Sequence, residues 1–421
     1  GTSPISLGIA AGWGSGNATI ANNEIHHVDG RAIQAGSSNN GSLQITGNIL
    51  YQNSVGVYLN NAGLGTLRSN TLLASNGIAV QNMKTSPLDA INNWWGSAAG
   101  PTAGQYAGNV AYAPWCTVAD CSQTAGPVTN TIKHLGYTSI QAAIDEAASG
   151  DVITVAAGTY AETLTVNKQV TLLGPNSEIN PNTGTRIAEA VIVYPAGLTT
   201  DKDLVSVSAA GVTISGFTLD GKDLDAALWG EGIYSEANNL TVKNNIVKNF
   251  RQIGIRSGAG WGGPYYTGAL VENNKVTSDV AGIYYTYSGI YLQGTQGIVK
   301  GNVVDSAYRG IQIQPYTNPA ATLGVVENNA FTAYKSPLYF NYSEHANSNW
   351  VFRNNILTGI ASLEAAPVDY WSGIVVETFY YGNVVFEKNQ VNLGTTNADV
   401  IYQYYERGTV NGTRSATPNW W

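Results

Sequence analysis

The sequence has little charge. Asp, Glu, Lys and Arg make up only 11% of the 421 residues, against about 25% in an average soluble domain. The formal net charge is −8 and no long basic run occurs, which argues against nucleic acid or an anionic membrane surface as a partner. No apolar run reaches the roughly 18 residues of a membrane-spanning helix, so we expect no membrane insertion.

Cysteine is nearly absent. The two that occur, Cys116 and Cys121, lie in the polar stretch PWCTVADCSQ with no His or further Cys nearby. That isolation disfavours a metal site, and we expect no resident metal or other cofactor. The close spacing instead predicts a disulfide, which would place the chain outside the cell or on its surface. No signal peptide opens the sequence, which we interpret as a processed or truncated start.

Hydrophobic residues are plentiful at 43%, and they recur in a fixed pattern with asparagine. The pattern is an apolar residue, two residues, Asn, one residue and a second apolar residue, as in ITGNIL and VKGNVV. It returns every 22 to 29 residues, and once after 34, within two sets. Its asparagines are Asn23, Asn48, Asn70 and Asn93, then Asn245, Asn274, Asn302, Asn329, Asn355 and Asn389.

Most of these asparagines are followed, seven to nine residues later, by Gly and a β-branched residue, as at Gly254-Ile255 and Gly310-Ile311. Each repeat therefore holds at least two short strands separated by a turn. One coil cannot bury its apolar face, but stacked coils can, with strands about 4.8 Å apart. The repeat predicts an all-β fold, a right-handed parallel β-helix.

The repeated asparagines are interpreted as architecture and not as catalysis. Asparagine tolerates the left-handed backbone conformation that a sharp turn between strands needs. Stacked at one height on every coil, the side-chain amides can also hydrogen-bond along a ladder.

Residues 137–175 predict a different feature, a short helix near 139–148 followed by strands. Thr138 and Gln141 form a capping-box start, and Gly150 a stop. This stretch resembles the N-terminal cap and first coils of extracellular parallel β-helix proteins of the pectate-lyase-like superfamily. The resemblance implies that the helix covers the open end of a solenoid, which would otherwise be an unprotected β edge.

A solenoid that starts near residue 137 divides the chain. We expect residues 1–115 to be the C-terminal coils of a first β-helix, 116–131 a linker with both cysteines, and 132–421 a second β-helix with its cap helix. The motif NNWW at Trp94-Trp95 returns as NWW at Trp420-Trp421, a period of 420 − 94 = 326 residues. This spacing predicts a tandem array.

The resembled superfamily hosts polysaccharide lyases and hydrolases, so the resemblance implies that this chain can be such an enzyme. A lyase would need acidic residues to hold calcium and an Arg or Lys base. The candidates in and after LDGKDLDAALWGEG are Asp220, Asp223, Asp225, Glu231, Arg251 and Arg256. The alternative is a polar loop with surface salt bridges. No Gly-His-Gly triplet or nucleophile constellation occurs, and His26 and His27 are expected on opposite faces of a strand.

Aromatic residues offer a second kind of site. On adjacent coils they could form a platform for sugar rings or for self-association, although Tyr also simply suits strands. The candidates are Trp229, Trp261, Tyr265, Tyr266, Tyr284, Tyr285 and Tyr287.

The sequence favours a non-enzymatic, extracellular structural or adhesive module of a larger surface, matrix or filament-forming protein. Its expected partners are neighbouring copies of itself, head-to-tail or in tandem, with glycans second. The alternative is a carbohydrate-active enzyme, a polysaccharide lyase or glycoside hydrolase, for which Ca²⁺ would be a possible cofactor.

Overall fold

The computed structural model describes residues 6–11, 17–35, 42–60, 65–73, 77–225, 227–250, 252–260, 263–277, 288–315, 323–340, 348–359, 374–376, 382–392 and 414–415. The chain divides into two compact units, Gly1–Thr138 and Ser139–Trp421. Each unit is a stack of coils built from short parallel strands. In the described residues, no helix is long and apolar enough to cross a membrane.

The first unit has three parallel sheets. The first contains β1 (Leu7–Ala11), β4 (Arg31–Ala35), β7 (Val55–Leu59), β10 (Ile78–Asn82) and β12 (Tyr106–Ala107). The second contains β2 (Ala18–Ala21), β5 (Leu43–Thr46), β8 (Gly65–Arg68), β11 (Leu88–Asp89) and β13 (Val110–Ala111), and the third β3 (Glu24–His26), β6 (Ile49–Tyr51) and β9 (Thr71–Leu72). The core is a stack of equivalent side chains: Ile33, Val57 and Val80 are in register and fully buried.

An aromatic cluster and a hairpin follow these coils. Trp95 is buried and packs edge-on against Tyr106 and Tyr112, with ring centroids 6.5 Å apart in both pairs. Strand β14 (Trp115–Cys116) pairs antiparallel with β15 (Thr124–Ala125), and a disulfide joins Cys116 to Cys121, as predicted. A second antiparallel pair, β16 (Val128–Asn130) and β17 (Leu135–Tyr137), completes the unit.

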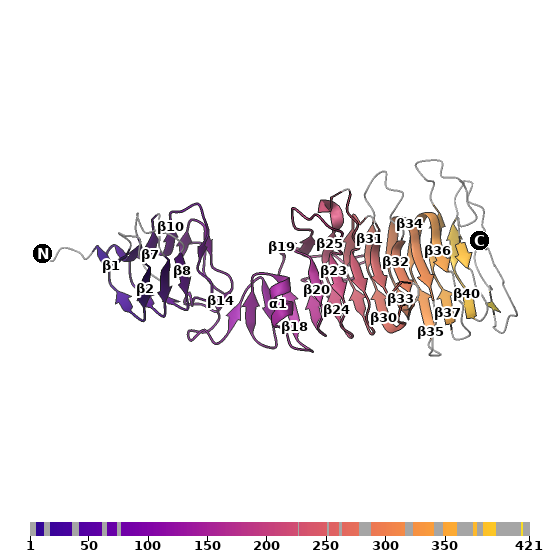
Figure 1. Cartoon of the computed structure of the whole chain (residues 1–421), viewed down its shortest axis with the longest axis horizontal. Coiled ribbons are helices and arrows are strands. Elements are labelled where there is room, and N and C mark those ends of the chain that lie inside the picture. Colours follow the sequence, from indigo (N-terminus) through magenta and orange to yellow (C-terminus); the bar gives the residue numbers. More distant parts are fainter. Residues whose placement is uncertain are drawn as a thin grey trace. The chain divides into compact units, whose positions relative to one another are not determined.

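The second unit is a longer solenoid with three faces (Figure 1). The first face contains β18 (Val152–Val155), β21 (Thr171–Leu173), β24 (Thr213–Ser215), β27 (Thr241–Lys243), β30 (Tyr266–Glu272), β33 (Thr295–Lys300), β35 (Leu323–Glu327), β37 (Ser348–Arg353), β40 (Gly382–Glu387) and β42 (Arg414–Ser415). The second contains β19 (Gly158–Ala161), β22 (Ala190–Val193), β25 (Thr218–Asp220), β28 (Ile246–Lys248), β31 (Lys275–Thr277), β38 (Ile356–Gly359) and β41 (Gln390–Asn392).

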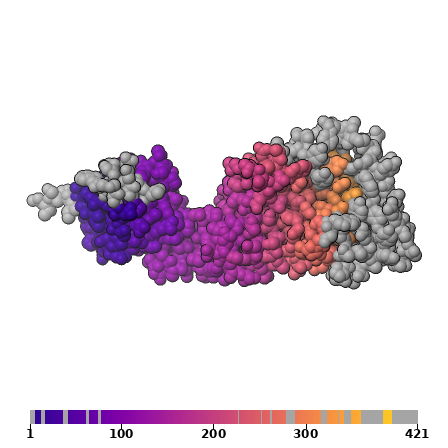
Figure 2. Space-filling model, viewed as in Figure 1, coloured from indigo at the N-terminus to yellow at the C-terminus, as the bar shows by residue number. Residues whose placement is uncertain are grey.

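The third face contains β20 (Leu164–Val166), β23 (Val205–Val207), β26 (Ile233–Ser235), β29 (Ile253–Ser257), β32 (Ser288–Gln293) and β39 (Ile374–Val376). Two long strands, β34 (Val303–Gln314) and β36 (Ala330–Phe340), run through the second and third faces. Figure 2 shows the described coils of this unit as bands whose colours follow the sequence. The predicted all-β parallel β-helix is confirmed.

The expected helix is present as α1 (Ile140–Glu146), but its caps differ from the prediction. The N-cap is Ser139, whose Oγ accepts from the backbone N–H of Ala142 at 3.1 Å, and Thr138 is not involved. The helix ends at an extended Ala147, before it reaches Gly150.

Residues from the following coil complete both ends of α1, which explains why local signals misplaced them. The carboxylate of Glu162 accepts from the N–H groups of Ile140 and Gln141, each at 2.9 Å. Lys168 Nζ donates to the carbonyls of Ile144 and Asp145. Tertiary contacts thus stabilise the charges of the helix dipole at both ends.

The repeated asparagines form two ladders, each at a corner between two sheets. In every consecutive pair the Nδ2 of one Asn donates to the Oδ1 of the next at 2.9–3.1 Å. The backbone N–H of the first Asn donates to the same oxygen. The ladders run Asn23, Asn48, Asn70, Asn93 and Asn245, Asn274, Asn302, Asn329, Asn355, Asn389.

The sequence predicted that the ladder asparagine itself has the left-handed conformation, and this is wrong. The left-handed residue of each of these turns is the one before the asparagine. All ten preceding residues have φ between 53° and 67°. They are Asn22, Gly47, Ser69, Asn92, Asn244, Asn273, Gly301, Asn328, Asn354 and Lys388. The reversal one residue earlier turns the ladder side chain inward, where its amide can bond to neighbouring coils.

Candidate functional site

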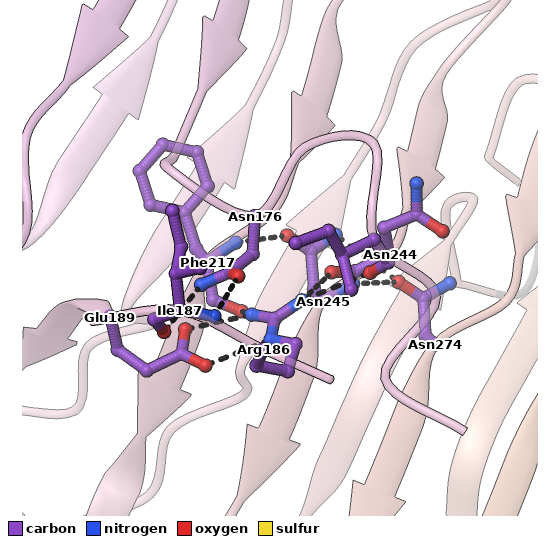
Figure 3. Close-up of polar contacts among 9 residues, drawn as sticks. Asn176, Arg186, Ile187, Glu189, Phe217, Asn244, Asn245 and Asn274 are labelled. Atoms are coloured by element: carbon purple, nitrogen blue, oxygen red, sulfur yellow. Dashed lines mark hydrogen bonds and ion pairs between the residues drawn. The ribbon is translucent and has the colours of Figure 1, made fainter. Parts of the chain in front are cut away.

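The segment 176–189 covers the first part of the ladder corner of the second unit, and Figure 3 shows polar contacts that hold it there. Arg186 is the centre of this cover: its Nε and Nη2 each donate to the Glu189 carboxylate at 2.8 Å, and its Nη1 donates to the carbonyl of Asn244 at 2.6 Å. Its Nη2 also lies 3.4 Å from the carbonyl of Phe217. Only 11% of the Arg186 side chain is exposed.

Two asparagines extend the same cover. Asn176 Oδ1 accepts from the N–H of Ile187 at 2.9 Å, which closes the segment on itself. Asn182 Nδ2 lies 3.3 Å from the carbonyl of Asn274 and 3.2 Å from that of Gly301. Because the segment uses these polar groups within the chain, we do not place a ligand site at this corner.

The corner between the second and third faces is open and differs from coil to coil. The connections into β23, β26 and β29 include residues 194–204, residues 221–225 with 227–232, and residues 249–250 with 252. Six residues of these connections and of β23 line an open pocket of about 470 Å³, which is within the range of small-molecule sites. The lining residues are Asp201, Lys202, Asp203, Ser206, Trp229 and Gln252. Three stacked coils contribute, so the pocket extends about 10 Å along the solenoid.

Side-chain and backbone bonds fix the loops of this pocket to one another. Asp201 Oδ1 accepts from the N–H of Trp229 at 2.8 Å, and Asp203 Oδ1 from the N–H of Glu231 at 3.1 Å. The N–H of Lys202 donates to the carbonyl of Trp229 at 3.0 Å. Each acidic residue thus holds the backbone of the next coil, and the pocket is preorganised.

A buried tyrosine supports the pocket from below. Tyr194 is only 2% exposed, and its hydroxyl donates to the carbonyl of Lys202 at 2.9 Å. A Cβ on Gly230 would lie 2.4 Å from this hydroxyl oxygen, so only glycine fits there. Burial raises the pKa of Tyr194, which therefore stays a neutral hydrogen-bond donor.

Trp229 is the aromatic residue of the pocket, and it is 42% exposed. Its backbone is bonded on both sides, to Asp201 and to Lys202. A large apolar ring held at the surface by its backbone provides a flat contact for a ligand.

Next to the pocket, Glu231 and Arg256 form a buried ion pair with a 2.9 Å contact between Oε1 and Nη1. Arg256 Nη2 donates to Gln293 Oε1 at 2.5 Å. The guanidinium also lies 4.8 Å from the ring centroid of Tyr234 and 5.6 Å from that of Tyr291. This network occupies three successive strands of the third face, β26, β29 and β32.

Burial raises the pKa of Glu231 from its usual 4.5 to about 7, despite the opposing charge of Arg256. Burial also raises the pKa of the neighbouring Asp203. For Arg256, desolvation opposes the charged form, but the charge and hydrogen bond of Glu231 outweigh it and raise the pKa. A carboxyl with a pKa near 7 matches a general acid or base in principle.

Access argues against that role for Glu231. Its side chain is only 6% exposed, Oε1 is bonded to Arg256, and Oε2 is buried without a hydrogen-bond partner. Neither oxygen is placed to meet a substrate. The pair therefore stiffens the wall beside the pocket, and it does not form a reaction centre.

The other predicted lyase residues do not join this pair. Asp220 lies on the second face, bonded to Asn249 Nδ2 at 2.7 Å and 3.3 Å from Lys248 Nζ. Asp223 ends the short 3-10 helix η1 (Gly221–Asp223), Asp225 lies in the loop after it, and both are exposed. Arg251 is outside the described residues. Among the residues that the structure describes, no three His, Cys, Asp or Glu side chains gather as a metal site.

The predicted aromatic residues do not lie together in the structure. Trp229 lines the pocket, whereas Tyr265, whose hydroxyl donates to Gln296 at 2.9 Å, and Tyr266 lie at the start of β30 on the first face. The other four predicted aromatics, Trp261, Tyr284, Tyr285 and Tyr287, lie outside the described residues.

The expectation that His26 and His27 point to opposite faces is wrong. His27 has a φ of 56°, so it already belongs to the turn after β3. This turn brings the two Nδ1 atoms to 2.7 Å, and the ring of His26 stacks on Tyr51 at 4.8 Å.

Five of the six pocket residues were not predicted from the sequence. Asp201, Lys202 and Asp203 form the tripeptide DKD directly before a strand, and Ser206 and Gln252 are common residues in common contexts. The usable signal is length: long loops precede β23 and β26, whereas the loop before β29 is short. Where a short loop stacks next to longer loops, a space is left between them, and here that space is the pocket.

Comparison with known proteins gives limited information. No family model and no curated protein matches the chain. Among solved structures, an alginate lyase from Paenibacillus sp. str. FPU-7 is similar with a TM-score of 0.43 and 18% identity, over 67% of this chain and 91% of that chain. At this level the similarity does not bear on what this chain does.

Proposed function

We propose that the chain is a non-catalytic, extracellular carbohydrate-binding module with its site at the Trp229 pocket. The observation that carries the proposal is the half-exposed indole in a preorganised pocket whose other lining side chains are polar. Sugar rings combine an apolar face with hydroxyl groups, and sites for them pair an aromatic plane with carboxylate, amide and hydroxyl groups. Asp201, Ser206 and Gln252 supply those three groups beside Trp229.

The size of the pocket favours a short part of a glycan. A length of about 10 Å, from three stacked strands, accommodates about two sugar rings. The pocket is open to solvent, so a bound glycan can extend beyond it.

A glycan-array screen followed by titration calorimetry tests the proposal. We expect the wild-type chain to bind at least one glycan, and Trp229→Ala to weaken that binding by tenfold or more. Tyr334→Ala is the matched control, because Tyr334 is 36% exposed on β36 and does not line the pocket. Equal weakening by both variants, or no binding to any glycan, would contradict the proposal.

A carbohydrate-active enzyme is the second candidate, and the pKa of Glu231 near 7 is the observation in its favour. The burial of both Glu231 oxygens argues against it. We expect no unsaturated products from alginate or pectate and no new reducing ends from neutral glycans. Turnover that Glu231→Gln abolishes would establish the enzyme instead.

The proposed setting is a larger surface protein. The Cys116–Cys121 disulfide supports an oxidising compartment. Association with neighbouring copies, head-to-tail or in tandem, remains part of this proposal and is tested by light scattering of the native protein. A uniform monomer at high concentration would contradict association between separate chains.

A further inference from the structure

We infer that the ligand of the Trp229 pocket carries a protonated amine, so that the preferred glycan contains an amino sugar that is not acetylated. This inference rests on the proposed function and names the ligand class of the same site. It depends on the charge of the lining residues and on how their polar atoms are used.

The charge of the pocket is negative. Two carboxylates, Asp201 and Asp203, line it with a single lysine, Lys202. The neighbouring Arg256 acts on Asp203 with its positive charge, but its guanidinium is held by Glu231 at 2.9 Å and by Gln293 and does not line the pocket. The balance favours a cationic group over an anionic one such as a uronate.

The two carboxylates still have acceptor capacity. In each, Oδ1 accepts a backbone N–H, from Trp229 for Asp201 and from Glu231 for Asp203. Asp203 Oδ2 has only a 3.4 Å contact with the hydroxyl of Ser206. A carboxylate accepts up to about four hydrogen bonds, whereas an ammonium offers three donors and no acceptor. An amine therefore matches the unused acceptors of both residues.

Trp229 adds a second attraction for the same group. The face of an indole ring carries negative charge density and attracts cations within about 6 Å of its centre. A pocket that combines this ring with two carboxylates stabilises an ammonium more than a neutral hydroxyl. Burial disfavours the ionised form of Asp203 and raises its pKa, and a bound cation would relieve this cost.

Titration calorimetry with a fully deacetylated glucosamine hexamer and its N-acetylated counterpart tests the inference. We expect the deacetylated hexamer to bind at least tenfold more tightly, and a galacturonate hexamer not to bind. Asp203→Asn should remove most of the preference, since the amide keeps an oxygen for the N–H of Glu231 but loses the charge.

A polycation could also be attracted by the net charge of −8 alone. Asp225→Asn is the control, because it changes the net charge equally at an exposed residue that does not line the pocket. Equal weakening by Asp203→Asn and Asp225→Asn would overturn the inference. Equal binding of both hexamers would overturn it as well but leave the proposed function standing, whereas failure of every glycan to bind would end both.

Discussion

Two corners of the same coils have opposite character. At the ladder corner the turns from Asn245 to Asn389 repeat one arrangement, a left-handed residue followed by an inward asparagine, and segment 176–189 covers part of this corner. At the pocket corner the loops before β23, β26 and β29 differ in length and sequence, and an open pocket lies between them. The comparison indicates that the repeated turns specify the fold. The proposed glycan site lies where the coils depart from the repeat.

The largest expected effect tests the ladder corner. Asn302→Ala removes the donor to Val271 and to Asn329 and leaves the two donors of Asn274 without their acceptor. We expect a loss of about 4 kcal/mol in the free energy of unfolding, because several buried polar groups lose partners. Denaturant unfolding measures it. Asn392→Ala, at an exposed position with one 3.3 Å contact, should cost under about 0.5 kcal/mol, and equal losses would refute the ladder's importance.

The next effect concerns the left-handed residue of the turn. Asn273 has a φ of 54°, and glycine occupies the equivalent position in the next coil, Gly301. Asn273→Val should therefore destabilise the chain by about 1–2 kcal/mol more than Asn273→Gly does. Thermal unfolding of the two variants side by side measures the difference. A valine variant as stable as the glycine variant would show that the turn does not require this conformation.

A pH-dependent effect tests the wall beside the pocket. Because burial raises the folded-state pKa of Glu231 from 4.5 to about 7, the folded chain holds this proton more tightly than the unfolded chain. The resulting stability is present below pH 4.5 and is lost as the pH rises through about 7. Melting temperatures of the wild type should fall over this window more steeply than those of Glu231→Gln. Parallel profiles would contradict the buried position of the carboxyl.

The smallest stability effect is expected at the pocket itself. Trp229→Ala should lower the free energy of unfolding by only about 1 kcal/mol, because the residue is 42% exposed. The same variant should lose glycan binding, which would separate the two corners by experiment. A loss of stability close to that of Asn302→Ala would mean that Trp229 belongs to the architecture.

The sequence was informative wherever the chain repeats itself. The spacing of Asn245 to Asn389 predicted the stacked coils. Outside the repeat, the close spacing of Cys116 and Cys121 predicted their disulfide. It misplaced the caps of α1, because Glu162 and Lys168 reach the helix from the next coil.

The pocket was out of reach for a related reason. Asp201, Asp203 and Gln252 come together only through the stacking of three loops of unequal length. No local pattern marks such a set, since each residue is ordinary in its own loop. Trp229 was predicted as a residue for carbohydrate contact or self-association, which stays a prediction, and the residues that surround it in the pocket were not predicted.

The covering segment also has a mechanical consequence. Between the coils of Asn274 and Asn302, the side chain of Asn302 makes three hydrogen bonds at the ladder corner: Oδ1 accepts two, and Nδ2 donates one to the carbonyl of Val271. Between the coils of Phe217 and Asn245 only two such bonds exist, because Phe217 stands in the place of an asparagine. Arg186 contacts the carbonyls of both Phe217 and Asn244 and so bridges this junction. We expect Arg186 to act as a clamp at this junction when the solenoid is pulled along its axis, because its contacts offset the bond that Phe217 cannot make.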